Sequence, residues 1–482
     1  MVFAAFAPTA IGSTVIEANP VAKEGLVSEE QGGLDAGADA GGGAGAPARG
    51  SGSGGAIAAG VGGAVAGSSG SVAGERKERH LSICVDSSRF RVETKQAGAG
   101  FDRVHIAHRA LPEFAMDDLD TGVNFLGSRL AMPLLVSCMT GGSSGGSRVN
   151  RELARAAADA GLAFGLGSFR SLLRDRERIG DFRVKSILGN LPLLANIGAV
   201  ALRDAGAAAV FELAKSIEAD ALVVHLNPAQ ELFQGGGDRD FRGLRDSIAR
   251  LVDEAKIAII VKETGFGIAP DEVRSLWELG VAWVDLAGAG GTNWIAVEAY
   301  RLEAGPLREA AADFDDWGWP SALLLAGLSD CGVLGGSAGL RLIASGGLRN
   351  GVDLAKAVAL GAGLGAMALP LVRALESGGR DGAAAFIERV AIGFRAAMLL
   401  SGSRNLEALR RGILGFDPEF LASAREIAAL GGGGLGAGGG AGGGATADTA
   451  ALRGAGEGAG LHVADQGAGG LGAGEGADDA PQ

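Results

Sequence analysis

Four polar side chains lie at the end of one short apolar run, ALVVHL at 221–226. They are His225, Asn227, Gln230 and Glu231. Polar groups need partners when they leave water, so four of them at the end of one buried strand indicate a binding site. Glu231 is the best candidate ligand for a hard cation, because Mg²⁺ is commonly held by one or two carboxylates together with substrate phosphate oxygens. The alternative for Glu231 is a surface salt bridge, since exposed carboxylates are the commoner kind.

Glycine-rich segments follow two other apolar runs, as GAGGT at 288–292 and GGLR at 346–349. Backbone N–H groups free of crowding by a Cβ atom can surround phosphate oxygens, which predicts a phosphate site. Arg349 would add a charge-assisted hydrogen bond to that phosphate. Lys262, at the end of the run AIIVK, suits the electron-rich N1–C2=O edge of a flavin.

A compact charge run, RKERH at 76–80, stands near the start of the apolar part of the chain. Spacing alone favours a solvated face for such a run. If the run folds over the ligand site, its cations are suited to bind a diphosphate.

Eight short apolar runs, alternating with longer amphipathic stretches, must position these residues, and this alternation predicts parallel strands joined by crossover helices. The eight runs are 133–138, 162–167, 192–197, 221–226, 258–262, 281–286, 341–345 and 364–369. The predicted fold is therefore an α/β protein with a closed (β/α)₈ barrel, in which the carboxyl ends of the strands form one pocket. We expect residues 75–130 to supply a strand and a lid, and residues 305–340 to add helices before the seventh strand.

Composition limits the folded part of the chain and its partners. Glycine contributes 85 of 482 residues, and the Gly-rich stretches 1–74 and 431–482 are predicted to be disordered, leaving 75–430 as the folded domain. A net charge of −13 without a Lys/Arg run predicts no nucleic-acid or anionic-lipid partner. The widely spaced Cys84, Cys138 and Cys331 suit a reducing compartment. Without a membrane-length apolar stretch or a basic flank before Lys23, we expect a soluble, cytoplasmic protein.

The motifs from about residue 75 to about residue 411 resemble those of the type 2, flavin-dependent isopentenyl-diphosphate isomerases. The motifs in question are RKERHLSIC, HRALPE, MTGG, GLGS, ANIGA, HLNPAQE, GDRDF, IVKETGFG, DLAGAGGTNW, DWGWPSA, ASGGLRNGVDLAKA and ALP. HLNPAQE and GAGGTNW are specific to this family, whereas GGLRNGVD is shared with other FMN barrels. The resemblance implies an isomerase that interconverts isopentenyl and dimethylallyl diphosphate. It also implies reduced FMN, Mg²⁺, NADPH as the reductant, and a homo-oligomer of four or eight chains.

Carried over to this sequence, the resemblance implies a role for each of the following residues. The FMN contacts are Cys138, Met139, Thr140, Ser168, Asn196, Lys262, Thr292, Gly347, Leu348, Arg349, Ala368 and Leu369. The diphosphate substrate is bound by Arg76, Lys77, Ser168, Phe169, Arg170, Asn227 and Gln230. His80, His225 and Gln230 are the catalytic residues, and Glu231 holds Mg²⁺. Because an amide is not an ordinary base, Gln230 is expected to orient the substrate or relay a proton.

The chain departs from the family pattern at three positions. Arg79 stands where the family usually has Glu, Phe169 where it usually has Gln, and Ala287 where it often has Ser. The first two departures fall at the substrate end, so a flavin-binding barrel with impaired catalysis is one alternative function. The other is an FMN-dependent 2-hydroxyacid oxidase or dehydrogenase, which needs a histidine base after the sixth strand. Residues 287–292 contain no histidine, which argues against that alternative.

Overall fold

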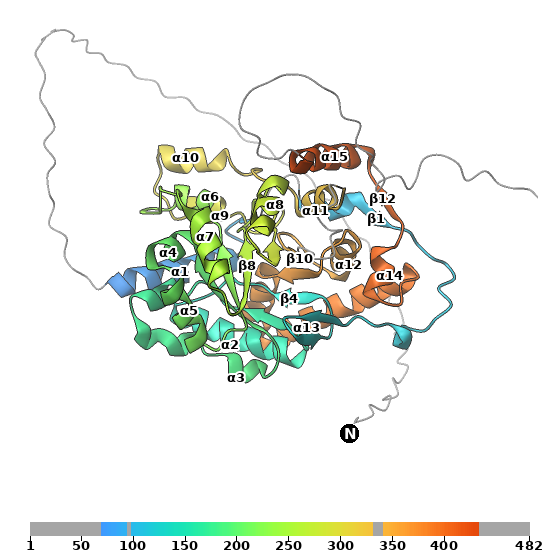
Figure 1. Ribbon diagram of the computed structural model, residues 1–482, viewed down its shortest axis with the longest axis horizontal. Coiled ribbons are helices and arrows are strands. Elements are labelled where there is room, and N and C mark those ends of the chain that lie inside the picture. The colour runs from blue at the N-terminus through green and yellow to red at the C-terminus, as the bar shows by residue number, and fades with distance from the viewer. Residues whose placement is uncertain (1–68, 94–97, 331–340, 433–482) are drawn as a thin grey trace, which may run out of the picture. The chain divides into compact units, whose positions relative to one another are not determined.

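Eight parallel strands close into a barrel in the computed structural model, which describes residues 69–93, 98–330 and 341–432 (Figure 1). The barrel strands are β4 (Leu134–Val136), β5 (Ala163–Gly165), β6 (Leu193–Gly198), β7 (Ala221–His225), β8 (Ala258–Lys262), β9 (Trp283–Asp285), β10 (Arg341–Ala344) and β11 (Leu364–Met367). Each strand pairs in parallel with its neighbour in the sequence, and β11 pairs with β4 to close the ring. The prediction of a (β/α)₈ barrel is confirmed, with one strand in each of the eight apolar runs.

Helices surround the barrel and connect its strands (Figure 1). They are α2 (Ser144–Asp159), α3 (Lys185–Leu188), α4 (Ala199–Ala205), α5 (Ala207–Ser216), α6 (Pro228–Phe233), α7 (Leu244–Asp253), α8 (Pro270–Glu278), α9 (Trp294–Ala299), α10 (Pro306–Ala312), α11 (Ser321–Asp330), α12 (Gly351–Ala359), α13 (Leu369–Leu400), α14 (Leu406–Arg410) and α15 (Pro418–Gly432). Two of them, α10 and α11, lie in the segment predicted to add helices before the seventh strand. The long α13 is kinked at Gly378 and Gly379, where the backbone leaves helical geometry.

The segment before the barrel folds as a helix and short strands. It contains α1 (Ser69–Val85), β1 (Val104–Ile106), β2 (Val123–Phe125) and β3 (Ser128–Leu130). Strand β1 pairs with β12 (Leu414–Phe416), and β2 pairs with β3 as a hairpin. The predicted boundary at residue 74 falls inside α1. Most of both predicted tails lies outside the described residues. Cys331 also lies outside them, and the two described cysteines, Cys84 and Cys138, are free thiols.

The inside of the barrel is filled by apolar side chains near the amino ends of its strands. Leu135, Leu194, Val223 and Ile260 pack there together with Trp283. The β2–β3 hairpin closes this end, because Phe125 meets the Trp283 ring edge-to-face with ring centres 5.0 Å apart. With one end closed, the carboxyl ends of the strands form the open mouth, as in other barrels of this type.

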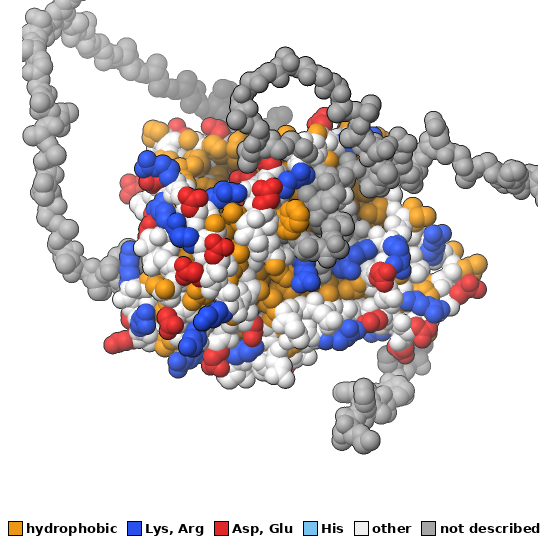
Figure 2. Space-filling model, in the orientation of Figure 1, with side chains coloured by type: hydrophobic (Ala, Val, Ile, Leu, Met, Phe, Trp, Pro, Cys, Tyr) orange, Lys and Arg blue, Asp and Glu red, His pale blue; other side chains and the backbone are white. Residues whose placement is uncertain are grey.

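Helix α1 lies beside α2, α9 and α13. Its residues Ile83 and Cys84 are buried against Val92, Val297 and Leu369, so its apolar side anchors it to the loops at the barrel mouth. On the face shown in Figure 2, Lys/Arg and Asp/Glu side chains are intermixed. None of the helices in the described ranges is long and apolar enough to span a membrane.

Candidate active site

One cavity of about 1370 Å³ opens at the carboxyl ends of the barrel strands. Its walls come from the loops after the strands and from α1, which approach from far-apart parts of the sequence. Every residue that the sequence assigned to the site lines this cavity, with Phe169 as the exception. The barrel therefore brings the predicted flavin, substrate and cation residues into one space.

Phe169 is placed differently from its neighbours Ser168 and Arg170. Its side chain is fully buried in the main hydrophobic core, and its backbone N–H donates to Asn196 O at 2.8 Å. A side chain with no accessible surface does not reach a ligand in this conformation. Phe169 therefore packs in the core and does not line the cavity with its neighbours, so its contact with the substrate stays a prediction.

His225 is held as a neutral imidazole at the end of β7. Burial and then the Lys262 charge lower its pKa to about 3. Its Nδ1 lies 2.7 Å from Asn196 Oδ1, an acceptor, so Nδ1 carries the proton and Nε2 keeps its lone pair. Gly198 makes room for this ring, because a Cβ atom there would lie 3.0 Å from Nε2. A neutral histidine with a free acceptor nitrogen can receive a hydrogen bond from a ligand.

Lys262 places a buried cation beside this histidine at the barrel axis. Its side chain is 11% exposed, and Nζ donates to Glu263 O at 2.7 Å and lies 3.6 Å from Asp285 Oδ2. The hydroxyl of Ser345 donates to the other oxygen of Asp285. A cation held in this way suits the electron-rich edge of a flavin ring.

The glycine loops meet on the far side of the cavity and fit a phosphate group. Gly347 has φ 105°, and a Cβ atom there would lie 2.5 Å from Ala99 Cβ and 2.7 Å from Gly290 O, so only glycine fits. Arg349 lies next to this loop and is bonded to Gly290 O and to Glu93. Leu369 also lines the cavity as the first residue of the long helix α13, and the backbone N–H of a first helical residue has no partner within its helix and can bind an anion. The residues present therefore fit the phosphate of FMN.

Positive charge gathers at the other end of the cavity. Lys77 Nζ donates to Ser168 O at 3.1 Å. Burial first, and then the nearby charges of Arg76, Arg178 and Arg170, together lower the pKa of Lys77 to about 8. Burial likewise lowers the pKa of Arg76. Because these cations repel one another, binding of an anion between them is favourable. A diphosphate carries enough negative charge to pair with several of them.

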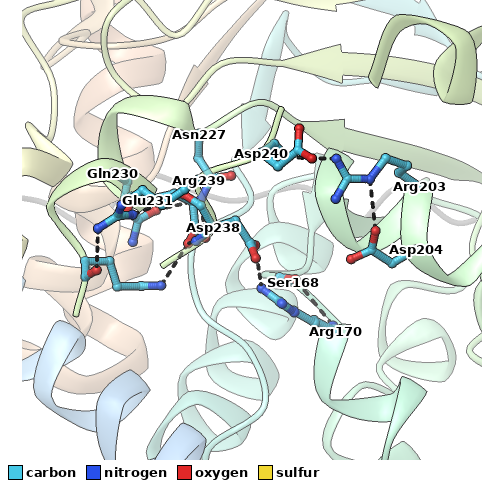
Figure 3. Close-up of polar contacts among 11 residues, drawn as sticks. Ser168, Arg170, Arg203, Asp204, Asn227, Gln230, Glu231, Asp238, Arg239 and Asp240 are labelled. Carbon is cyan, nitrogen blue, oxygen red and sulfur yellow. Dashed lines mark hydrogen bonds and ion pairs between the residues drawn. The ribbon is translucent and has the colours of Figure 1, made fainter. Parts of the chain in front are cut away.

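Glu231 lies beside these cations with its carboxylate oriented by three N–H donors (Figure 3). Asn227 Nδ2 donates to Oε1 at 3.1 Å, while Gln234 Nε2 and the Asp238 backbone N–H donate to Oε2 at 3.0 and 2.9 Å. The side chain of Asp238 turns the other way, and its Oδ2 lies 3.4 Å from Arg170 Nη1. Within the described part of the chain, no group of three His, Cys, Asp or Glu residues could hold a metal ion. Among the described residues, Oε1 of Glu231 accepts only the hydrogen bond from Asn227, so this oxygen keeps a lone pair that fits a Mg²⁺ ion whose other ligands are substrate oxygens and water.

Glu298 is a site residue that the sequence analysis missed. It lies on α9, its side chain is 1% exposed, and its Oε1 is 2.8 Å from His80 Nε2 and 3.1 Å from Gln230 Nε2. Burial by itself raises the pKa of Glu298, but the contacts with His80, Gln230 and Arg301 outweigh it, so the pKa lies below its usual value. One carboxylate thus joins two of the predicted catalytic residues. In the sequence, its only signal is a single acid in the apolar stretch WIAVEAY.

Comparisons with known proteins agree with this geometry. The family model described as FMN-dependent dehydrogenase matches residues 84–179 and 225–415. The chain is 39% identical over 337 residues to the isopentenyl-diphosphate delta-isomerase of Borreliella afzelii (strain PKo), covering 70% of this chain and 91% of that protein. It is 40% identical over 344 residues to the enzyme of the same name from Methanosarcina acetivorans, covering 70% and 91%. A putative lactate oxidase from Pediococcus acidilactici superposes with a TM-score of 0.51 at 16% identity, covering 71% of this chain and 94% of that one. At that identity, the likeness shows the fold alone.

Proposed function

Since the chain belongs to the isopentenyl-diphosphate delta-isomerase family, we propose that it interconverts isopentenyl diphosphate and dimethylallyl diphosphate, using reduced FMN and Mg²⁺. The observation that carries the proposal is one cavity lined both by the glycine loops that fit the FMN phosphate and by the cations next to Glu231. A diphosphate ester bound to these cations would share the cavity with the flavin. The chain is an enzyme of this family, and FMN is the cofactor that its family match supports.

The cations and Glu231 bind the diphosphate in the proposed mechanism. Arg76, Lys77 and Arg170 would neutralise its oxygens, and Glu231 would hold a Mg²⁺ ion that supplies further positive charge. The reaction passes through a tertiary cation and gives an allylic diphosphate. An allylic diphosphate can ionise with the diphosphate as the leaving group, so cations that hold the diphosphate oxygens keep the product intact. Asn227 keeps the Glu231 carboxylate turned toward the cavity.

Around the hydrocarbon, the residues hold protons and exclude water. Moving a double bond requires protonation of one alkene carbon and removal of a proton from another. When bound, reduced FMN supplies ring proton donors and an electron-rich face. Glu298 fixes Gln230 and His80 beside the substrate, so the amide of Gln230 can orient the substrate or relay a proton. His225 stays neutral and offers Nε2 as an acceptor, which avoids a positive charge beside a carbocation.

The flavoenzyme alternative is 2-hydroxyacid oxidation, which the description of the matching family model favours. That chemistry needs a histidine base after β9, and residues 287–292 contain none. Anaerobic incubation of the full chain with isopentenyl diphosphate, FMN, NADPH and Mg²⁺ should yield dimethylallyl diphosphate. Oxidation of lactate or glycolate without that product would establish the alternative. A yellow protein that binds Mg²⁺ and diphosphate but turns over neither substrate would instead be the catalytically impaired barrel.

The remaining parts of the proposal concern the setting of the enzyme. We infer that NADPH reduces the flavin, that the protein is cytoplasmic, and that it forms a homo-oligomer of four or eight chains. We also infer that residues 75–130 act as the cap of the site, which the position of α1 at the barrel mouth supports. Light scattering of the purified chain tests the oligomer, and flavin reduction by NADPH against NADH tests the donor.

A further inference from the structure

Asn150 is a buried polar residue that the proposed mechanism does not use. It lies on α2, beneath the loop after β4, and is 1% exposed. Its Oδ1 accepts a hydrogen bond from Thr140 Oγ1 at 2.6 Å, while its Nδ2 has no hydrogen-bond partner in the described part of the chain. A buried donor without a partner destabilises a fold, and an apolar side chain of this size would avoid that penalty. The asparagine therefore calls for a reason beyond packing, and its side-chain hydrogen bond to Thr140 indicates one.

Thr140 is held in place on the cavity side of this contact. Its carbonyl oxygen accepts from the Gly167 N–H at 2.7 Å, and a Cβ atom on Gly167 would lie only 2.2 Å from that oxygen. Helix α2 is fixed as well, since its N-cap Ser143 accepts from the Gly146 N–H at 3.1 Å. Asn150 thus reaches Thr140 from a rigid helix, and Thr140 lines the cavity.

The direction of this hydrogen bond decides what Thr140 offers a ligand. The Asn150 Oδ1 atom can only accept, so the Thr140 hydroxyl must point its hydrogen at Asn150. Toward the cavity, Thr140 Oγ1 then presents lone pairs and acts as an acceptor. A reduced flavin carries more ring N–H donors than an oxidised one, so an acceptor in the flavin site favours the reduced form.

We propose that Asn150 is a positioning residue that makes Thr140 an acceptor toward the flavin and thereby favours reduced FMN. This inference rests on the proposed use of reduced FMN. Asn150 does not line the cavity itself, but through Thr140 it would help to keep the flavin reduced.

The test compares oxidised and reduced FMN binding to the full-length protein and its Asn150→Leu variant, by anaerobic titration. Loss of one oriented acceptor should weaken binding of reduced FMN about 5-fold and leave binding of oxidised FMN unchanged. The flavin midpoint potential should fall accordingly, and the melting temperature of the apoprotein should not fall, because the unpaired amide is gone. An unchanged ratio of the two affinities, or an equal loss for both forms, would overturn the inference.

Two further variants separate this role from a general packing effect. Thr140→Val should give the same change in the affinity ratio, and the double variant should add little to it, because both changes break one interaction. This variant also keeps the test valid if Asn150→Leu fails to fold. Ser147→Ala is the matched control: Ser147 is 2% exposed on the same helix and accepts from Arg151 Nη1 at 2.6 Å within that helix. Its affinity ratio should equal that of the unmodified protein. A protein that binds no FMN at all would instead refute the proposed function.

Discussion

We predict that Lys77 makes the affinity of this enzyme for a diphosphate fall between pH 7 and pH 9. Burial and neighbouring cations lower its pKa to about 8 in the free protein. A bound diphosphate stabilises the protonated amine and raises this pKa, so binding weakens as pH rises through about 8 and levels off at the higher pKa of the complex. Burial lowers the pKa of Arg76, but a guanidinium does not lose its proton in proteins, so Arg76 adds no slope of its own.

The size of the effect follows from the fraction of Lys77 that is protonated. One pH unit above the pKa of the free protein, about one molecule in ten carries the charge, so KM for isopentenyl diphosphate should rise about 10-fold between pH 7 and pH 9. Calorimetric titration with inorganic pyrophosphate and Mg²⁺ over the same range should give the same slope without contributions from catalysis. The substrate diphosphate is already ionised there, so its own titration contributes little.

The control is Lys77→Arg, which keeps a charge that does not titrate. Its pyrophosphate affinity is expected to be lower overall, because a guanidinium cannot take the place of an ammonium that lies on Gly142, but its pH profile should be flat. A wild-type KM that stays constant from pH 7 to pH 9.5 would refute the reasoning. So would an Arg variant with the same slope as the unmodified enzyme.

Three other variants test the remaining contacts of the site. Glu231→Gln should abolish Mg²⁺-dependent turnover while FMN stays bound, as read from the flavin absorbance; loss of FMN as well would mean that Glu231 has a structural role. Glu298→Gln should lower kcat roughly 100-fold, because a buried hydrogen bond to a charged carboxylate contributes about 2–3 kcal/mol. Steady-state rates would measure this loss, and the affinity for FMN should stay unchanged. Asp238→Asn should raise KM a few-fold by releasing Arg170, since a partly exposed ion pair contributes about 1 kcal/mol or less. Asp240→Asn, two residues along the same loop and with its carboxylate paired to Arg242, should leave KM unchanged, and equal effects of the two substitutions would contradict a specific role for Asp238.

The fold was predictable from the sequence because strand and helix periodicity are local properties. Each of the eight apolar runs bounded by polar or glycine residues became a barrel strand, and the amphipathic stretches between them became helices. The residues that end those strands had to meet once the barrel closed. For this reason, His225, Lys262, Thr292 and Arg349 were predicted together without any knowledge of distances.

The sequence did not reveal those residues whose role depends on the direction in which the side chain points. Phe169 sits between two cavity residues in the chain, yet it faces the core. Glu298 and Asn150 lie on helices, where a polar residue usually faces water, but packing buries both against the site. Their roles come from partners in other elements of the fold, Glu298 from His80 and Gln230, and Asn150 from Thr140.

By itself, the sequence determined the barrel, the set of strand ends that form its mouth, and the kinds of ligand those residues suit. Only the tertiary structure decided which polar groups are buried against one another, and thus that burial lowers the pKa of His225 to about 3 and the pKa of Lys77 to about 8. The physical reason is that the repeat of apolar residues that distinguishes a strand from a helix is set by residues close together in the chain. Desolvation and Coulomb interactions depend instead on distances between residues that the chain brings together only when it is folded.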